Sequence, residues 1–454
     1  MTTVIGGLDL LVTVDEDDSV LAERDLVIED GVIAEIRPAR SRLGGAGVID
    51  GRGRLALPGL VNLHTHLPMT LLRGLAEHVD LQGFLARVWA AEAAVMDPET
   101  VELGARLGAL ESLLGGCTTQ LDMYFHHEQA HRGAVAAGSR HVGGPVFFDG
   151  PGPDGLDWAQ RLEGLRAWPA ALAELGGPQV PVAAMPHATY TNSPAHLAEV
   201  CRVLTSLPDA PRRLLTTHVS ENAAENTDVL ARHGATPTAL LTGAGWLEES
   251  APPLVMAHAV HLTETDIAAV ARAGDRVALA HCPGSNLKLA SGALPWESLR
   301  GNSIRVGLGT DGCSSSNDLD MWQVLRQAAL LARLTSGDPA AAPAEAIIRA
   351  ATLGGAQALG LGDLIGSLEV GKRADLVLLD LHQPHLTPIH DVAALLVFAA
   401  GRGDVTDVLV DGEVVVRERR STRLDTPALL AACRERAVAA GAAAGAAGAG
   451  PGGA

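Results

Sequence analysis

The chain has 454 residues, 47% of them apolar, which is enough for a large buried core and predicts one large domain with a smaller one. Its formal net charge of −19, without any block rich in Lys or Arg, argues against nucleic acid or a membrane surface as the main partner and favours a small-molecule substrate. The start of the chain lacks signal-peptide features, no stretch resembles a membrane span, and the five cysteines show no CxxC spacing, so we expect a reducing, cytoplasmic location.

The two ends of the chain share a pattern that the middle lacks. DLVIEDGVIAEIRP, residues 25–38, alternates apolar side chains around an Asp-Gly pair, which is typical of a β-hairpin. GKRADLVLLDL and DVLVDGEVVV, within residues 371–416, repeat the pattern. We therefore expect one small β-sandwich domain formed by both termini, from residues 1–57 and 363–420.

The middle of the chain, residues 58–362, alternates short apolar runs with segments of helical length. Thr263 and Asp266 form a capping box that predicts the start of one such helix, and Gly274 predicts its end. Eight strands separated by helices are the count of a (β/α)₈ TIM barrel, so the expected fold class is α/β. The eight predicted strands cover residues 60–63, 118–123, 142–148, 180–185, 214–217, 254–257, 277–280 and 304–309.

Polar side chains end several of these strands, where the catalytic groups of such barrels lie. His64 and His66 share one face of the first strand and can hold one ion together. An HxH pair alone is a weak signal and is more often two half-exposed histidines on a strand. His218 after the fifth strand and Asp311 after the eighth add an imidazole and a carboxylate, so the set predicts one divalent metal per chain, zinc or alternatively iron, with a position open for water.

Two of the acidic residues have a plainer interpretation beside the functional one. Glu221, three residues after His218, can carry a proton above the metal, or it can be a first-turn glutamate favoured by the helix dipole. Asp311 precedes Gly312 and can also be an ordinary turn residue. Its place at the eighth strand end favours the ligand interpretation.

Lysine occurs only at Lys288 and Lys372. No lysine lies near the fourth strand, where a carbamylated side chain would bridge two metals. This absence favours a single metal and disfavours the cyclic-amide hydrolases that share the barrel.

Five segments together resemble the amidohydrolase superfamily and, within it, the methylthioadenosine/S-adenosylhomocysteine deaminase group. They are PGLVNLHTHLPMTLLRGLAE, THVSENAAE, MAHAVHL, CPGSNLKLASG and GLGTDGCSSSNDLDM, and the similarity extends from about residue 48 to residue 380. The resemblance implies a metal-dependent barrel that deaminates an aminated purine nucleoside by hydrolysis. The implied substrates are adenosine, 5′-deoxyadenosine, 5′-methylthioadenosine or S-adenosylhomocysteine, and ammonia is released.

The resemblance also implies roles for individual residues. The implied catalytic residues are Glu221, which moves a proton, His258, which orients a water molecule, and Asp311, which accepts the proton of that water. The implied metal ligands are His64, His66, His218 and Asp311. The implied substrate contacts are Glu92 in WAAE for the ribose hydroxyls, His187 in MPHATYTNSP, and Glu221. His281, which ends the seventh strand, is a further expected substrate contact.

The sequence departs from this group between the third and fourth strands. GGPVFFDGPGPDGLDW has no counterpart to the arginines that receive the homocysteine carboxylate, and WAAE lacks the usual proline. These departures favour substrates with an uncharged 5′ group.

Two other functions stay open at this point. One is a barrel enzyme acting on another aminated heterocycle, such as guanine, a pterin or an s-triazine. The other is a non-catalytic scaffold that kept the barrel. A homo-oligomer is also left open, and the Ala/Gly-rich tail, residues 437–454, is expected to be disordered.

Overall fold

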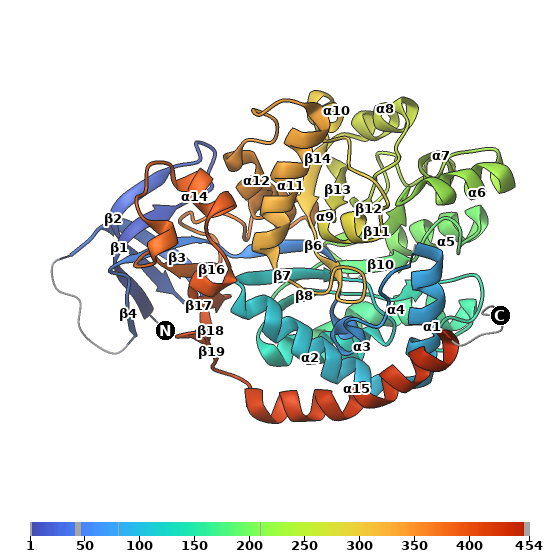
Figure 1. Ribbon diagram of the computed structural model, residues 1–454, viewed down its shortest axis with the longest axis horizontal. Coiled ribbons are helices and arrows are strands. Elements are labelled where there is room, and N and C mark those ends of the chain that lie inside the picture. The colour runs from blue at the N-terminus through green and yellow to red at the C-terminus, as the bar shows by residue number, and fades with distance from the viewer. Residues whose placement is uncertain (1, 41–46, 80, 209, 449–454) are drawn as a thin grey trace.

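The computed structural model describes residues 2–40, 47–79, 81–208 and 210–448 (Figure 1). Its larger part is a barrel of parallel strands wrapped by helices, and a β-rich domain at the left of Figure 1 contains strands from both ends of the chain. The α/β fold class with a terminal β-rich domain is therefore confirmed. The domain limits at residues 57/58 and 362/363 stay predictions.

The barrel strands follow one another around a closed ring. They form two hydrogen-bonded sheets, β14-β13-β12-β11-β10-β9 and β15-β6-β7-β8, and every pairing within them is parallel. Their bounds are β6 (Leu60–His66), β7 (Cys117–Asp122), β8 (Arg140–Val142), β9 (Val146–Phe147), β10 (Val182–Pro186), β11 (Arg213–Val219), β12 (Leu254–His258), β13 (Val277–His281), β14 (Arg305–Leu308) and β15 (Asp311–Gly312).

The third and eighth strands of the ring are each interrupted. Between β8 and β9 a Cβ at Gly144 would lie 2.0 Å from the Ala183 carbonyl oxygen, and Pro145 has no N–H to donate. Between β14 and β15 a Cβ at Gly309 would lie 2.9 Å from the His64 carbonyl oxygen. Glycine at these two positions lets the neighbouring strand approach closely, which is a reason for interruptions that an apolar pattern does not reveal.

Helices connect the strands and lie outside the ring (Figure 1). Two further elements, the 3₁₀ helix η1 and α1, follow β6 before the first outer helix. The bounds are η1 (Leu67–Leu72), α1 (Leu81–Val95), α2 (Pro98–Leu114), α3 (His127–Ala137), α4 (Trp158–Leu175), α5 (Pro194–Ser206), α6 (Ala223–His233), α7 (Pro237–Gly243), α8 (Glu264–Ala273), η2 (Gly274–Arg276), α9 (Pro283–Lys288), α10 (Trp296–Gly301), α11 (Met321–Ser336), α12 (Ala344–Ala350) and α13 (Leu353–Ala358). The predicted capping box is confirmed, since Thr263 caps α8 together with Asp266 and Gly274 follows the last helical residue.

The strands of the terminal domain form one continuous sheet rather than two separate sheets. Most of its strand pairs are antiparallel, and β1 pairs in parallel with β4 and β5. Both predicted Asp-Gly hairpins are present, β2–β3 around Asp30-Gly31 and β17–β18 around Asp411-Gly412. The elements are β1 (Thr2–Val12), β2 (Val20–Glu29), β3 (Val32–Pro38), β4 (Val48–Asp50), β5 (Arg54–Pro58), β16 (Leu376–Asp380), η3 (Pro384–Leu386), α14 (Val392–Phe398), η4 (Arg402–Asp404), β17 (Val405–Val410), β18 (Glu413–Arg417) and β19 (Arg420–Ser421). Pairing of β5 with both β1 and β16 joins the two ends of the chain.

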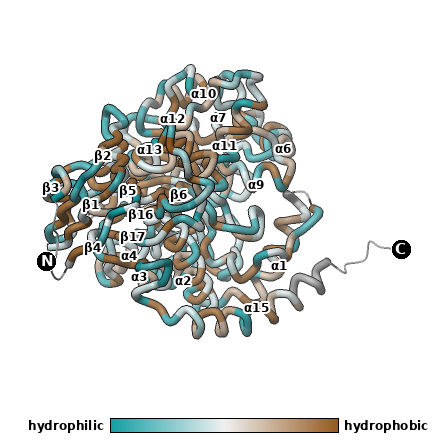
Figure 2. The backbone as a smooth tube through the Cα atoms, turned by 60° about the vertical axis from the view of Figure 1, so that its left-hand side comes forward, coloured by the Kyte–Doolittle hydropathy of each residue, from teal (hydrophilic) through white to brown (hydrophobic). Residues whose placement is uncertain are grey.

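Apolar side chains fill the inside of the barrel and the space between the strands and the outer helices. In Figure 2 the brown, hydrophobic segments gather in the interior and teal segments occupy the periphery. The described residues contain no helix that is both long enough and apolar enough to cross a membrane.

The disorder expected for the tail is wrong for residues 437–448. They continue α15 (Thr426–Gly448), which lies against α1, α2 and η1 (Figures 1 and 2). Alanine has the highest helix propensity, so an Ala-rich repeat forms a helix once it packs on a neighbour, and Ala440 is buried here. Residues 449–454 lie outside the described residues.

One buried ion pair links the barrel to the terminal domain. The guanidinium of Arg140 on β8 has no exposed area and donates to both oxygens of Asp375, over 2.8 and 2.9 Å. It also donates to the Asp411 carboxylate over 3.2 Å and to the Gln179 carbonyl over 2.9 Å. Asp375 immediately precedes β16, so this pair fixes the terminal domain against the third strand of the barrel.

Truncation of this arginine is expected to destabilise the whole protein. Arg140→Ala leaves Asp375 buried without its partner, which typically costs about 3–5 kcal/mol. Arg52→Ala removes an exposed pair with Asp50 and is the control, with little expected effect on stability. Thermal and urea denaturation measure both variants, and equal stability of the two would contradict the role given to Arg140.

Candidate active site

Four side chains from three strands meet at one end of the barrel. His64 and His66 close β6, His218 lies in β11, and Asp311 begins β15. The His64 and His218 ring centroids are 4.8 Å apart, as are those of His64 and His66. An Asp311 carboxylate oxygen lies 3.2 Å from His66 Nε2 and 3.5 Å from His64 Nε2. The structure therefore brings together the four residues that the sequence predicts as metal ligands.

Backbone carbonyls orient two of the imidazoles. His66 donates its Nδ1–H to the Met123 carbonyl over 2.6 Å, and His218 donates its Nδ1–H to the His187 carbonyl over 2.6 Å. Because a carbonyl can only accept, Nδ1 of each ring carries a proton, and Nε2 is the nitrogen that can serve as a ligand at the centre of the site. This is how proteins fix the tautomer of a metal-binding histidine.

These side chains fit a divalent cation. Both ring nitrogens of His64 are buried and have no hydrogen-bond partner in the described structure, which is costly unless another ligand takes one of them. Donor atoms of His64, His66 and His218, and those of His64, His258 and Asp311, lie within 4.8 Å of one another. Three imidazoles with one carboxylate suit a borderline-soft ion. The barrel thus has a site for a divalent metal.

Burial and the Asp311 carboxylate set the charge of the ligand histidines. Burial lowers the pKa of His64 to about 4 and that of His218 well below its usual value, so both are neutral, as metal ligands must be. Burial acts in the same direction on His66, but the adjacent Asp311 carboxylate raises the pKa of His66 to about 9. His66 therefore has to lose a proton when it binds a cation.

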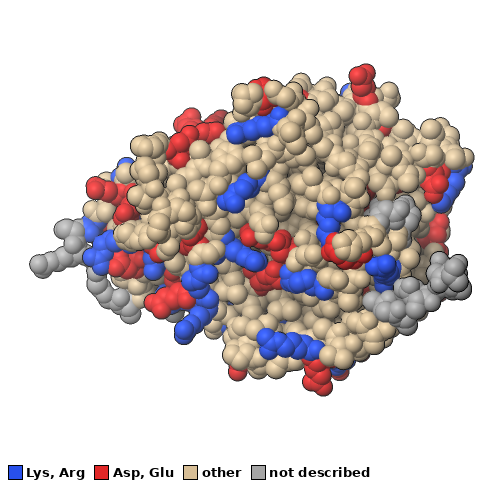
Figure 3. All heavy atoms as spheres, in the orientation of Figure 1, with Lys and Arg blue, Asp and Glu red and all other residues tan. Residues whose placement is uncertain are grey.

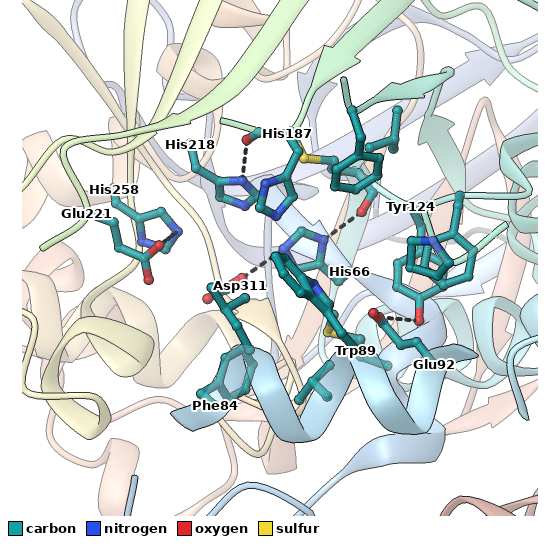
Figure 4. A pocket seen from close by; sticks show the side chains of 18 of the residues that line it. His66, Phe84, Trp89, Glu92, Tyr124, His187, His218, Glu221, His258 and Asp311 are labelled. Carbon is teal, nitrogen blue, oxygen red and sulfur yellow. Dashed lines mark hydrogen bonds and ion pairs between the residues drawn. The ribbon is translucent and has the colours of Figure 1, made fainter. Parts of the chain in front are cut away.

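Glu221 and His258 lie together on one side of this cluster (Figure 4). His258 Nε2 is 3.9 Å from a Glu221 carboxylate oxygen, and the Nδ1–H of His258 donates to the Asn286 side-chain oxygen over 3.0 Å. Burial raises the pKa of Glu221, although His258 lowers it, and a carboxyl of raised pKa is suited to carrying a proton. Helix α6 begins only after its cap Asn222, so Glu221 is not a first-turn residue.

Four non-glycine residues at these strand ends have left-handed backbone conformations. They are Ser220, His258, Ala259 and Asp311, with φ of 51°, 70°, 53° and 59°. Such conformations cost free energy and persist where surrounding contacts impose them, which is common at active sites. The structure holds Asp311 in this conformation through the Thr65 hydroxyl, which donates to its carbonyl over 3.1 Å.

A pocket of about 680 Å³ opens beside the cluster. Figure 4 shows Glu221, His258 and Asp311 at one side, Glu92 and Tyr124 at the other, and Phe84 and Trp89 between them on α1. Most of the remaining wall is apolar or aromatic. The lining residues are His66, Met69, Phe84, Leu85, Val88, Trp89, Glu92, Met123, Tyr124, Phe125, Val146, Phe148, Pro153, His187, Tyr190, His218, Glu221, His258, Leu289 and Asp311.

Glu92 is a buried pocket residue and not an exposed helix residue. Its side chain accepts a hydrogen bond from the Tyr124 hydroxyl over 2.7 Å, and its residue exposure is only 3%. Burial raises the pKa of Glu92 to about 7, while the Tyr124 hydroxyl and His66 act to lower it. The second carboxylate oxygen remains available to a polar ligand.

The other two predicted substrate contacts differ from each other. His187 lines the pocket, stacks on Phe148 at 5.1 Å between ring centroids, and has its pKa lowered to about 3 by burial, so it is neutral. His281 is not among the described residues that line the pocket, and its buried ring lies 6.3 Å from that of Trp296 between centroids. The substrate contact of His281 stays a prediction.

The wall of this pocket contains no Lys or Arg among the described residues. The guanidinium carbon of Arg161 lies 5.2 Å from the ring centroid of Phe148, which lines the pocket. Arg161 is almost fully buried and pairs with both oxygens of Asp154, over 2.5 and 3.0 Å. Its charge is therefore neutralised behind the aromatic wall.

Sequence reasoning missed Tyr124, Asn286 and the aromatic wall. Tyr124 lies two residues beyond the end of β7, and the strand-end rule that found the histidines would have found it too. Asn286 lies within the CPGSNLKLASG segment, but no spacing rule connects it to His258. Phe84 and Trp89 belong to α1, an insertion after the first barrel strand. The position of α1 over the pocket depends on tertiary packing and cannot be predicted from the sequence.

Comparison with known proteins agrees with this geometry. A model of the Amidohydrolase family matches residues 55–415. The 5-methylthioadenosine/S-adenosylhomocysteine deaminase of Desulforudis audaxviator is 39% identical over 416 residues, 89% of this chain and 92% of the relative. A solved adenosine deaminase of Xanthomonas campestris with bound zinc is 37% identical, with a TM-score of 0.89 over 96% of this chain and 98% of that one. The atrazine chlorohydrolase of Arthrobacter aurescens TC1 complexed with zinc is 25% identical, with a TM-score of 0.85 over 96% and 100%.

The resemblance in the sequence motifs is thereby confirmed. The family match covers most of the chain, and the relatives are similar over nearly their whole lengths. The structure adds a barrel with a site for a divalent metal at the carboxyl ends of its strands. The chain belongs to the amidohydrolase family.

Proposed function

We propose that this protein is a hydrolytic deaminase of purine ribonucleosides that releases ammonia. The observation that carries the proposal is a single pocket with a proton-carrying carboxyl, Glu221, and the metal site at one end and a second buried carboxyl, Glu92, at the other. The first end suits attack on the amino-bearing ring, and the second suits the ribose hydroxyls. The names of the deaminase relatives support the same reaction.

The proposed metal is one zinc ion per chain, held by His64, His66, His218 and Asp311. A zinc-bound relative supports zinc over iron. When bound, such an ion supplies Lewis acidity that lowers the pKa of water to about 7 and so provides a nucleophile at neutral pH.

The reaction exchanges the amino group of the purine ring for oxygen. Water adds to the carbon that bears the amino group, the bond from that carbon to the amino nitrogen then breaks, and the products are the oxopurine nucleoside and ammonia. Glu221 protonates the ring nitrogen beside the attacked carbon, which makes the carbon more electrophilic. A general acid in this position typically contributes about 10²–10⁴ in rate.

Asp311 accepts a proton from the attacking water, and His258 orients that water. One Asp311 oxygen accepts the Ser315 hydroxyl over 2.7 Å, which fixes the carboxylate while its other oxygen faces the histidines. Asp311 takes one proton from the water and passes it to the departing amine, and the second proton of the water returns to the Glu221 carboxylate as the C=O bond forms. His258, fixed by Asn286, orients the water from the side of Glu221.

The far end of the pocket selects the substrate. Glu92, positioned by Tyr124, accepts the ribose hydroxyls, and His187 contacts the ring system from the wall. An apolar wall without Lys or Arg desolvates a neutral 5′ group at little cost and a zwitterionic one at high cost. We therefore propose adenosine, 5′-deoxyadenosine and 5′-methylthioadenosine as better substrates than S-adenosylhomocysteine.

The other functions have weaker support. Guanine, pterins and triazines lack ribose hydroxyls and would leave the second carboxylate oxygen of the buried Glu92 without a partner from the ligand. A scaffold without catalysis has no use for Glu221 beside a complete ligand set. We also propose a cytoplasmic location, because the five cysteines are all unpaired and buried. A nucleic-acid partner is not proposed, since acidic and basic side chains are interspersed on the face in Figure 3.

The metal site is tested by elemental analysis. The purified protein is expected to contain one divalent metal per chain, and His64→Ala/His66→Ala to contain almost none, because two of the four ligands are removed. His382→Ala/His390→Ala, which removes two histidines away from the site, is the control. Two metals per chain, or full retention by the double variant at the site, would show that the ligand set is wrong.

The reaction is tested by an ammonia-release screen over adenosine, 5′-deoxyadenosine, 5′-methylthioadenosine, S-adenosylhomocysteine, adenine, guanine and a pterin. Ribonucleosides are expected to react best, and Glu221→Gln to lower kcat by about 10²–10⁴ while it keeps the metal. Glu264→Gln, a first-turn glutamate of α8, should leave kcat unchanged. A loss of less than about tenfold in Glu221→Gln would remove the proton role.

Ribose recognition is tested by the ratio of kcat/KM for adenosine to that for adenine. Glu92→Gln should lower this ratio about 10- to 100-fold, because a hydrogen bond to a charged group contributes about 1.5–3 kcal/mol. The exposed Glu99→Gln is the control. Reactivity of 2′,3′-dideoxyadenosine should not change in Glu92→Gln. An unchanged ratio would remove the nucleoside assignment and favour a free heterocycle.

A further inference from the structure

A buried chain of polar side chains lies behind the metal site and takes no part in the reaction described above. It links Asp122 at the end of β7, His141 on β8 and His131 on α3. All three residues are at most 2% exposed. Buried titratable groups are costly unless they are fully hydrogen-bonded, so a chain of three calls for an explanation.

The end of β7 holds His66 through three hydrogen bonds. The Met123 N–H donates to the Thr65 carbonyl over 3.0 Å, and the Met123 carbonyl accepts the Nδ1–H of His66 over 2.6 Å. The Asp122 carboxylate accepts the backbone N–H of Leu67 over 2.9 Å. The dipeptide of Asp122 and Met123 therefore fixes the residues on both sides of His66 as well as its ring.

The two histidines in turn fix Asp122. His141 Nε2 lies 2.9 Å from the second Asp122 oxygen, and His141 Nδ1 lies 3.1 Å from His131 Nδ1. His131 Nε2 lies 3.1 Å from the Gly176 carbonyl, which can only accept, so that nitrogen carries a proton. Burial lowers the pKa of His131 to about 4, so its ring is neutral and its Nδ1 is an acceptor. His141 then donates with both nitrogens, and every polar atom in the chain is paired.

We propose that Asp122, His141 and His131 form a positioning network that holds His66 in its metal-binding orientation and thereby raises the affinity for the metal. The proposal rests on the metal site proposed above. None of the three residues lines the pocket, so they act through His66 and are not catalytic residues. Loss of such an outer partner typically weakens metal binding about 10- to 100-fold.

The test is the zinc dissociation constant, measured by competition with a chromophoric chelator, together with the melting temperature of each metal-free variant. Asp122→Ala should weaken zinc binding about 10- to 100-fold, because it removes the hydrogen-bond partner of both the Leu67 N–H and His141 Nε2. Asp122→Asn should restore most of the affinity, since its amide oxygen can accept from Leu67 and its amide N–H can donate to the other tautomer of His141. His141→Ala tests the same network if Asp122→Ala does not fold.

Arg140→Ala is the matched control for His141→Ala. The two residues are adjacent on β8 and both buried, but Arg140 pairs with Asp375 of the terminal domain and not with the network. It should lower the melting temperature and leave the zinc dissociation constant unchanged. Wild-type affinity in Asp122→Ala and His141→Ala, an equal loss in Arg140→Ala, or no rescue by Asp122→Asn would overturn the proposal. Failure of the wild-type protein to bind zinc would instead overturn the metal site itself.

Discussion

The pairing of β15 with β6 closes the barrel and also assembles the site. In this short parallel ladder Asp311 lies opposite Thr65 and Gly312 lies opposite His66. Asn62 strengthens the closure, since its side chain exchanges two hydrogen bonds with Thr310, over 2.7 and 3.1 Å. Because the first and last strands meet here, a carboxylate and two imidazoles that are some 245 residues apart in sequence come within 3.5 Å. Strand β11 adds the ligand His218, and Glu221 and His258 at the ends of β11 and β12 complete the site.

The groups around the metal ligands have two roles: some orient the histidine rings, and others form and support the pocket. Carbonyls at the ends of neighbouring strands fix the tautomers of His66 and His218, while Asn286 does the equivalent for His258 through its side chain. Helix α1 lies over the opening and contributes both the apolar wall and Glu92, so its position relative to the strands determines the size of the substrate. Helix α15 packs on α1, which makes the end of the chain part of the support for the pocket.

Among the described residues, the two buried arginines each have a carboxylate partner. Arg161 pairs with Asp154 behind Phe148, and Arg140 pairs with Asp375 between the domains. The pocket itself keeps only histidines and three carboxyls, of which Glu92 and Glu221 have raised pKa values because they are buried. A neutral, planar and partly apolar ligand with hydroxyl groups at one end matches these surroundings better than a highly charged one.

The sequence by itself determined the barrel, the hairpins and the strand-end residues, because each depends on local rules: apolar runs of strand length, Asp-Gly turns, and polar residues directly after a strand. It could not show that the His281 ring lies beside that of Trp296, since the direction of a side chain at a strand end depends on how the following turn packs. Nor could it decide the state of the Ala/Gly-rich tail, where composition allows helix or disorder and only packing on α1 selects the helix. The tertiary structure alone decided the aromatic wall, the Tyr124–Glu92 pair and the Asp122 network, because their members come from different elements and meet only when the barrel closes.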